Sequence, residues 1–158
     1  RYGNVLNSRE STLPKFRDIG ISRNLDNYFP VTHDKMTRFF MRLEDSIELI
    51  HNSILYANSG ETIIPILNAF KIYELAELFS SIYNRPIKIV GIRQGEKLDE
   101  CLINIEESFR TEKRKMGNKE YYVIHPMYKP YLQERILDKE YTSNKTMAVS
   151  KELIEDFI

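Results

Sequence analysis

Two short segments of the sequence carry residue types that could bind an anionic ligand. They are Met36-Thr37-Arg38-Phe39-Phe40 and Gly91-Ile92-Arg93-Gln94-Gly95-Glu96-Lys97-Leu98. Each sets an arginine at the edge of an apolar element, where a guanidinium can donate paired, charge-assisted hydrogen bonds to phosphate oxygens. Glu96, three residues after Arg93, could accept hydrogen bonds from sugar hydroxyls. The alternative is an ordinary surface pair of Arg93 with Glu96, and spacing alone favours that alternative.

Motifs for nucleophilic, metal-dependent or dinucleotide chemistry are missing from the sequence. The histidines His33, His51 and His125 are scattered, and none stands at metal-ligand spacing from a cysteine or another histidine. The sequence also has no G-x-S-x-G, no P-loop and no G-x-G-x-x-G. We therefore predict no catalytic, cofactor-binding or metal-binding residue in this chain.

The composition is that of one ordinary domain with a balanced charge. The chain has 158 residues, of which 42% are hydrophobic, and its 23 Lys and Arg are matched by 23 Asp and Glu. No overall field attracts nucleic acid or an acidic membrane, and the one dense basic cluster, at 113–115, stands among glutamates. The longest apolar run, at 63–67, is far shorter than the ~20 residues that span a bilayer. Cys101, the single cysteine, is expected to be a small buried residue in a reducing, cytoplasmic protein.

Two amphipathic helices are the clearest elements that could position the candidate segments. The first spans 42–56, and its apolar residues at spacings of four, three and four predict one buried stripe, formed by Leu43, Ile47, Ile50 and Ile54. The second spans 71–83 and is expected to bury Ile72, Leu75, Ala76, Phe79 and Ile82.

Shorter elements are expected around these helices. The pattern predicts strands at 1–6, 28–32, 61–66, 87–92 and 121–124, and helices at 11–19, 96–102 and 150–157. The stretches 104–118 and 127–147 are expected to be irregular. Helix and strand alternate twice in the middle of the chain, which favours an α/β fold with parallel strand pairing. The opening residues resemble a strand already in progress, so the chain is expected to begin in the middle of a fold.

Five motifs occur in the order found in one enzyme family. They are Arg1-Tyr2-Gly3-Asn4-Val5, the pair Ser8-Arg9 with Ser11 and Pro14, the two candidate segments above, and Tyr141-Thr142-Ser143-Asn144. Together they resemble the capsule- and flagellin-type UDP-N-acetylglucosamine 4,6-dehydratases of the extended short-chain dehydrogenase/reductase family, including the inverting enzymes. The resemblance spans almost the whole chain.

The resemblance implies an α/β fold that is the C-terminal part of an extended short-chain dehydrogenase/reductase. Residues 1–158 would form a nucleotide-sugar-binding domain that includes the last strands of a Rossmann sheet. The NAD(P)-binding half, with its Tyr-x-x-x-Lys pair, would lie upstream, so the chain alone is expected to be inactive and to bind no cofactor. The parent would be a lyase that uses NADP or NAD to make sugars for surface polysaccharide or glycoprotein, a homo-oligomer without nucleic-acid or membrane partners.

The resemblance also implies the contacts of the UDP-sugar. By motif position, Asn4 would hydrogen-bond near the diphosphate, Arg38 and Arg93 would hold its charge, and Glu96 would accept from the ribose hydroxyls. Thr32 is a further candidate near the nucleotide, and backbone groups at 12–16 would line a slot for the uracil.

Several residues depart from the family pattern. Glu10 replaces a usual glycine, Gln94 a usual proline and Ile66 a usual lysine, while Asp99-Glu100 stands where His-Glu is common. These changes leave open the identity of the sugar and the outcome at C5. They also leave open a stand-alone nucleotide-sugar-binding or interaction module as the alternative to half of an enzyme.

Overall fold

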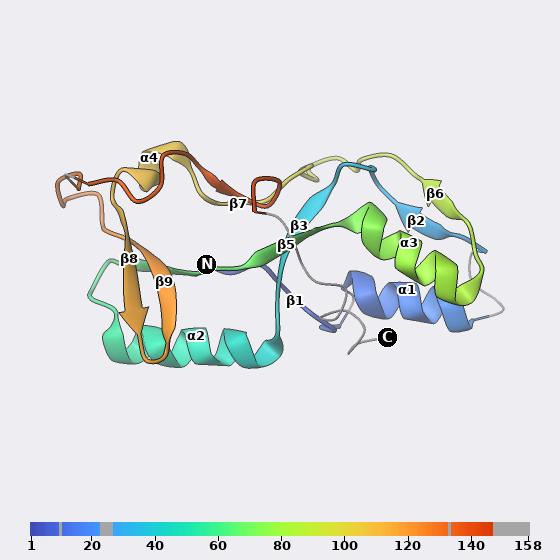
Figure 1. Cartoon of the computed structure of the whole chain (residues 1–158), viewed down its shortest axis with the longest axis horizontal. Helices are drawn as coiled ribbons and strands as arrows, with labels where there is room; N and C mark the ends of the chain where they lie inside the picture. Colours follow the sequence, from blue (N-terminus) through green and yellow to red (C-terminus); the bar gives the residue numbers. More distant parts are fainter. Residues whose placement is uncertain (10, 23–26, 133, 147–158) are drawn as a thin grey trace.

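The computed structural model describes residues 1–9, 11–22, 27–132 and 134–146. Two lobes lie at the ends of a short central sheet (Figure 1). One lobe contains α1 (Thr12–Ile21), β2 (Phe29–Val31), α3 (Ile72–Tyr83) and β6 (Ile87–Ile89). The other contains α2 (Leu43–Tyr56), β4 (Thr62–Pro65), α4 (Ile105–Ser108), β8 (Thr111–Met116) and β9 (Lys119–Ile124). The predicted helix at 150–157 and the Glu10 substitution lie outside the described residues.

The first lobe is held together by aromatic rings. Phe16 of α1, Phe29 of β2 and Phe79 of α3 have ring centroids 5.4 to 6.0 Å apart in tilted and edge-on arrangements, geometries that aromatic quadrupoles favour. Strand β2 pairs with β6 in parallel, as the alternation of helix and strand predicts. Helix α3 buries its predicted face, except that Ile82 is 49% exposed.

The central sheet has the order β1-β3-β5 and carries the first candidate segment. Its middle strand, β3 (Thr37–Met41), pairs in parallel with β1 (Asn4–Val5) and antiparallel with β5 (Asn68–Lys71). Because side chains alternate along a strand, Arg38 stands between buried Thr37 and buried Phe39 and keeps its own side chain near the surface. The sequence analysis missed both β3 and β5 as strands.

The second lobe is built on an antiparallel sheet that the sequence analysis only half predicted. Strands β4, β9 and β8 pair in that order, so the expectation of parallel pairing fails here. The irregular stretch predicted for 104–118 is wrong, because it contains α4 and β8. Asn104 caps α4 by accepting from the Glu107 backbone N–H at 2.8 Å. The sequence of β8 does not show the alternation of apolar and polar residues that marks a strand. Its middle residues are charged, and only its end residues, Thr111 and Met116, are buried.

Helix α2 has the predicted bounds, but its apolar stripe points outward. Leu43, Ile47, Ile50 and Ile54 are 57%, 59%, 52% and 78% exposed, so the predicted burial is wrong. The buried residues are Ser46, Leu49 and Asn52. Asn52 donates to the Met116 carbonyl and to the Tyr121 hydroxyl. A polar residue that satisfies partners on the β8–β9 hairpin therefore turns the apolar residues of α2 away from the lobe.

Two smaller expectations also need correction. Residues 96–102 form turns followed by β7 (Cys101–Ile103), which pairs with β10 (Tyr141–Thr142), in place of the predicted helix. Cys101 is exposed, because it begins this short strand at the surface. Among the described residues, no helix has both the length and the apolar character needed to cross a membrane.

Candidate functional site

One pocket of about 460 Å³ contains all five residues singled out in the sequence. It lies between α1, the end of β2, strand β3 and the loop that follows β6. The five lining residues are Asn4, Thr32, Arg38, Arg93 and Glu96. Segments that are up to 92 positions apart in the sequence therefore share one cavity, which is what the resemblance requires of a ligand site.

Arg38 is a half-buried cation whose guanidinium is already hydrogen-bonded within the pocket wall. Its guanidinium donates to the carbonyls of Thr37 at 2.7 Å, Lys97 at 2.7 Å and Leu98 at 3.0 Å. It also lies 3.8 Å from carboxylate oxygens of both Glu96 and Glu100. With 15% of its side chain exposed, Arg38 fastens the 97–98 segment to β3 and contributes positive charge from within the wall.

Arg93 is the more available cation of the pair. It is exposed in a loop between Gly91 and Gly95, whose φ angles of 88° and 82° suit glycine and few other residues. Its backbone N–H donates to Glu96 at 3.2 Å. In the described part of the chain its guanidinium makes no ion pair, so the expected surface pair with Glu96 does not form and all five donors stay available to a ligand.

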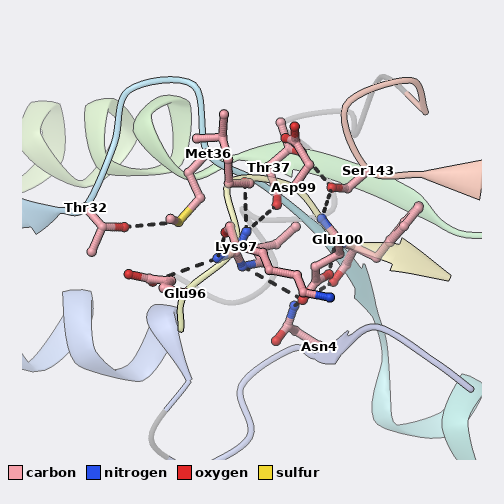
Figure 2. Close-up of polar contacts among 12 residues, drawn as sticks. Asn4, Thr32, Met36, Thr37, Glu96, Lys97, Asp99, Glu100 and Ser143 are labelled. Carbon is pink, nitrogen blue, oxygen red and sulfur yellow. Dashed lines mark hydrogen bonds and ion pairs between the residues drawn. The ribbon is translucent and has the colours of Figure 1, made fainter. Parts of the chain in front are cut away.

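Asn4 and Glu100 connect β1, β3 and the loop after β6. The Asn4 amide donates to the Phe39 carbonyl at 3.1 Å and to Glu100 at 3.0 Å. The other oxygen of Glu100 accepts from the Phe39 backbone N–H at 2.8 Å. Figure 2 shows the Asn4 and Glu100 side chains meeting below the strand. Glu100, which follows the departure at Asp99, thus sets the position of Asn4.

A second hydrogen-bonded group anchors the same loop from behind. Thr37 lies 2.6 Å from Asp99 and 2.6 Å from the Ser143 hydroxyl, which also accepts from the Glu100 backbone N–H at 2.9 Å (Figure 2). Asn144 donates to the second oxygen of Asp99 at 2.9 Å. The sequence analysis noted 141–144 and Asp99 only as parts of motifs. The spacing of residues in the sequence could not predict that these residues position the loop, because their hydrogen-bond partners come from distant parts of the chain.

Thr32 and Glu96 complete the predicted set from two further elements. The Thr32 hydroxyl donates to the Met36 sulfur at 3.0 Å, a weak bond that a better acceptor could replace. Glu96 keeps 28% of its side chain exposed. Its carboxylate is therefore able to accept from a ligand hydroxyl while it holds the Arg93 backbone.

Helix α1 forms one wall of the pocket. The sequence analysis expected only backbone groups at 12–16 to contribute to this wall. Ser11, Thr12, Lys15 and Phe16 line the pocket, and so does Asp18. Lys15 is exposed and its ammonium makes no ion pair with any described residue. Among the described residues, Lys15 and Arg93 are thus two lining cations on separate elements whose charged groups have no protein partner.

The described residues do not fit a nicotinamide cofactor. A dinucleotide pyrophosphate is cradled by a glycine-rich turn that opens a helix. The glycines that have open space around them, Gly91 and Gly95, stand four residues apart in a loop that leads to β7. We assign no cofactor contact to this chain.

The chain is similar to enzymes that act on UDP-sugars. Residues 1–124 match the family described as polysaccharide biosynthesis protein. The chain is 37% identical over 129 residues to the UDP-N-acetylglucosamine 4,6-dehydratase (inverting) of Campylobacter jejuni, covering 82% of this chain and 36% of the relative. It is 34% identical over 170 residues to the UDP-glucose 4-epimerase of Rickettsia bellii, covering 100% of this chain and 48% of that relative.

A solved structure gives the same picture of the fold. The crystal structure of Pen from Bacillus thuringiensis superposes with a TM-score of 0.79 at 28% identity, covering 99% of this chain and 48% of Pen. The chain therefore spans less than half the length of each of these three proteins.

Proposed function

The chain belongs to the polysaccharide biosynthesis protein family, and from this premise we propose that it is the nucleotide-sugar-binding part of a UDP-N-acetylglucosamine 4,6-dehydratase. The observation that carries the proposal is the pocket of about 460 Å³ that gathers Asn4, Thr32, Arg38, Arg93 and Glu96. A cavity of this size, with a mostly apolar lining and a few polar groups, suits one small ligand.

Four of the lining residues have roles that suit a UDP-sugar. Arg93, with its donors free, contacts the diphosphate directly through charge-assisted hydrogen bonds. Arg38 adds charge from within the wall and holds the loop that carries Glu96. Glu96 accepts from the ribose hydroxyls, and Asn4, which Glu100 fixes in place, presents its amide oxygen to the ligand as an acceptor.

The reaction of the parent enzyme needs groups that this chain does not supply. In the parent, a nicotinamide cofactor, NAD or NADP, would supply the hydride chemistry. Residues that hold the cofactor and move protons during water loss would come from the remaining length of the parent. This chain binds and orients the nucleotide, and the product serves surface polysaccharide or glycoprotein synthesis.

A UDP-sugar epimerase is the second candidate for the parent. The Rickettsia bellii epimerase matches this chain over its full length, whereas the Campylobacter jejuni dehydratase matches 82% of it. Both candidates require a UDP site, and they differ in the sugar. A stand-alone nucleotide-sugar-binding module requires the same site without a catalytic half.

A thermal-shift titration tests the UDP site directly. A ligand that binds only the folded chain must raise its melting temperature, by an amount that grows with concentration above Kd. We expect UDP and UDP-N-acetylglucosamine to raise it and ADP to have no effect at equal concentration. A larger shift with UDP-glucose than with UDP-N-acetylglucosamine would favour the epimerase. No shift with any UDP compound would contradict the proposed function.

Lys15 offers a smaller test of the same pocket from the α1 side. Lys15→Gln should weaken UDP binding roughly threefold to fivefold, because an exposed cation near a phosphate contributes at most about 1 kcal/mol. The matched control is Arg17→Gln, which removes a cation two positions along α1 that does not line the pocket. Calorimetry at low salt should separate the two variants, and equal affinities in both would exclude Lys15 from the site.

A further inference from the structure

Two carboxylates line the pocket, and only one of them has a role in the site described above. Glu96 has that role, and Asp18 of α1 has none. The Asp18 side chain is exposed, and no described residue donates to its carboxylate. Its backbone carbonyl accepts from the Ser22 N–H at 2.9 Å, which fixes the last turn of α1. A carboxylate in a pocket for an anionic ligand repels that ligand, unless a donor of the ligand bonds to it.

Helix α1 runs along the pocket, and its two ends lie beside different parts of it. The helix follows β1 through a short turn, in which the Ser8 N–H donates to the Val5 carbonyl at 3.3 Å. Figure 1 shows α1 running from the end of β1 toward the far ends of β2 and β6. At 1.5 Å per residue, the helix from Thr12 to Asp18 is about 9 Å long. Asp18 therefore lies almost two turns away from the end of the pocket that holds Asn4.

The later turns of α1 face an apolar part of the pocket. Ile19 of α1, Pro30 of β2 and Val90 after β6 line it. The Val90 N–H donates to a β2 carbonyl at 2.9 Å. Phe16 contacts Phe29, the residue before Pro30, with ring centroids 5.4 Å apart, so this part of α1 packs against β2. Such a wall suits the apolar faces of a flat ring, whose polar edge then needs a hydrogen-bonding group.

The charges nearest to Asp18 on α1 leave its oxygens available. Lys15 lies one helical turn earlier and also lines the pocket. In the described part of the chain it makes no ion pair with Asp18. Arg17, the preceding residue, does not line the pocket. The Asp18 carboxylate can therefore accept from a ligand without breaking a contact of the protein.

We propose that Asp18 determines the base specificity of the site because its carboxylate accepts a hydrogen bond from the N3–H of uracil, an inference that rests on the proposed function. With the diphosphate at Arg38 and Arg93 and the ribose at Glu96, the base extends along α1. Uracil has an N–H donor at N3, whereas unprotonated cytosine has an acceptor there, which a carboxylate repels. Asp18 thus adds a side-chain acceptor to the backbone groups at 12–16.

The test compares UDP with CDP by calorimetric titration of the folded chain. The two ligands have the same charge and nearly the same size, and they differ at N3 and at the neighbouring position 4 of the ring. A site that hydrogen-bonds a ligand N–H rejects an analogue that lacks it, so the wild type should prefer UDP by about tenfold or more. Asp18→Asn should lower this preference at least fivefold, because an amide can donate to cytosine as well as accept from uracil. Asp18→Ala should lower it similarly, because no group is left to read N3.

The preference for UDP over CDP is measured within each variant, so a loss of folded protein affects both ligands equally. Glu77→Gln is the matched control, since it removes an exposed carboxylate on α3 that does not line the pocket, and it should keep the wild-type preference. Equal affinities for UDP and CDP in the wild type would overturn the inference. So would a preference that is unchanged in both Asp18→Asn and Asp18→Ala, since backbone groups alone would then select the base. Failure of the proposed function gives a different result, namely a wild type that does not bind UDP.

Discussion

UDP binding should fall by roughly tenfold or more when Arg93 is replaced by alanine. The loss of one charged partner of a phosphate costs ~1.5 to 3 kcal/mol, and each ~1.4 kcal/mol is a factor of ten in affinity. Arg93 gives the sharpest test because its guanidinium has no described protein partner, so its removal leaves no buried carboxylate or carbonyl unsatisfied. Calorimetric titration of the folded chain with UDP measures the change.

The control for Arg93 lies in the same loop. Lys97→Ala removes an equal charge from an exposed residue that does not line the pocket, so its effect should be small and should vanish at high salt. Arg38→Ala should weaken UDP binding too, and it should also lower the melting temperature because it frees the carbonyls of Lys97 and Leu98. Unchanged UDP affinity in both Arg38→Ala and Arg93→Ala would show that the ligand lies elsewhere.

Much of the fold was predictable from the sequence, because strong local patterns survive folding. The fold class is confirmed as the α/β type of the C-terminal part of an extended short-chain dehydrogenase/reductase. Helices α2 and α3 begin and end within one residue of their predicted bounds. Their apolar spacing and the breaks after Tyr56 and Tyr83 are local features. Strands β3 and β5 were missed because their pairing partners lie about 30 residues apart.

The face of α2 that packs against the lobe could not be predicted from the apolar pattern of the helix. Periodicity shows that one face is apolar, but it does not show which neighbour covers that face. In this chain Leu49 and Asn52 turn toward the β8–β9 hairpin because Asn52 finds two hydrogen-bond partners there.

The sequence predicted which residues line the candidate site, but it did not predict what each of them does there. The motifs place Arg38 and Arg93 together, yet only the structure distinguishes a cation held by three carbonyls from one whose donors are free. Likewise the sequence offers no role for Glu100, but the structure shows that it holds Asn4 and the Phe39 backbone in place. Such roles depend on residues about 60 to 100 positions away, and no spacing rule reports them.

Glu61→Gln should destabilise the chain by about 2 kcal/mol at neutral pH. The Glu61 side chain is fully covered, and both of its oxygens accept from the Arg114 guanidinium at 2.8 Å. The Asn58 backbone N–H donates to it as well, at 2.8 Å. These bonds, the Arg114 pair first, lower the pKa of Glu61 to about 2. Each unit of pKa corresponds to ~1.4 kcal/mol, and solvent around Arg114, 24% exposed, screens part of the total.

The sign of the pH dependence follows from the lowered pKa. Because the folded value lies below the usual value of 4.5, the stabilisation is complete above about pH 4.5 and is lost as the pH falls toward 2. His125 also faces Glu61, with Nδ1 3.4 Å from the carboxylate, and Glu112 shares Arg114. Urea unfolding at several pH values should therefore show a gap between wild type and Glu61→Gln that is widest near neutral pH and closes under acid. Glu120→Gln breaks only the exposed pair with Lys113 and should cost less than about 0.5 kcal/mol. A gap between wild type and Glu61→Gln that stays constant down to pH 2 would mean that packing, and not the charge of Glu61, stabilises the β4–β9–β8 lobe.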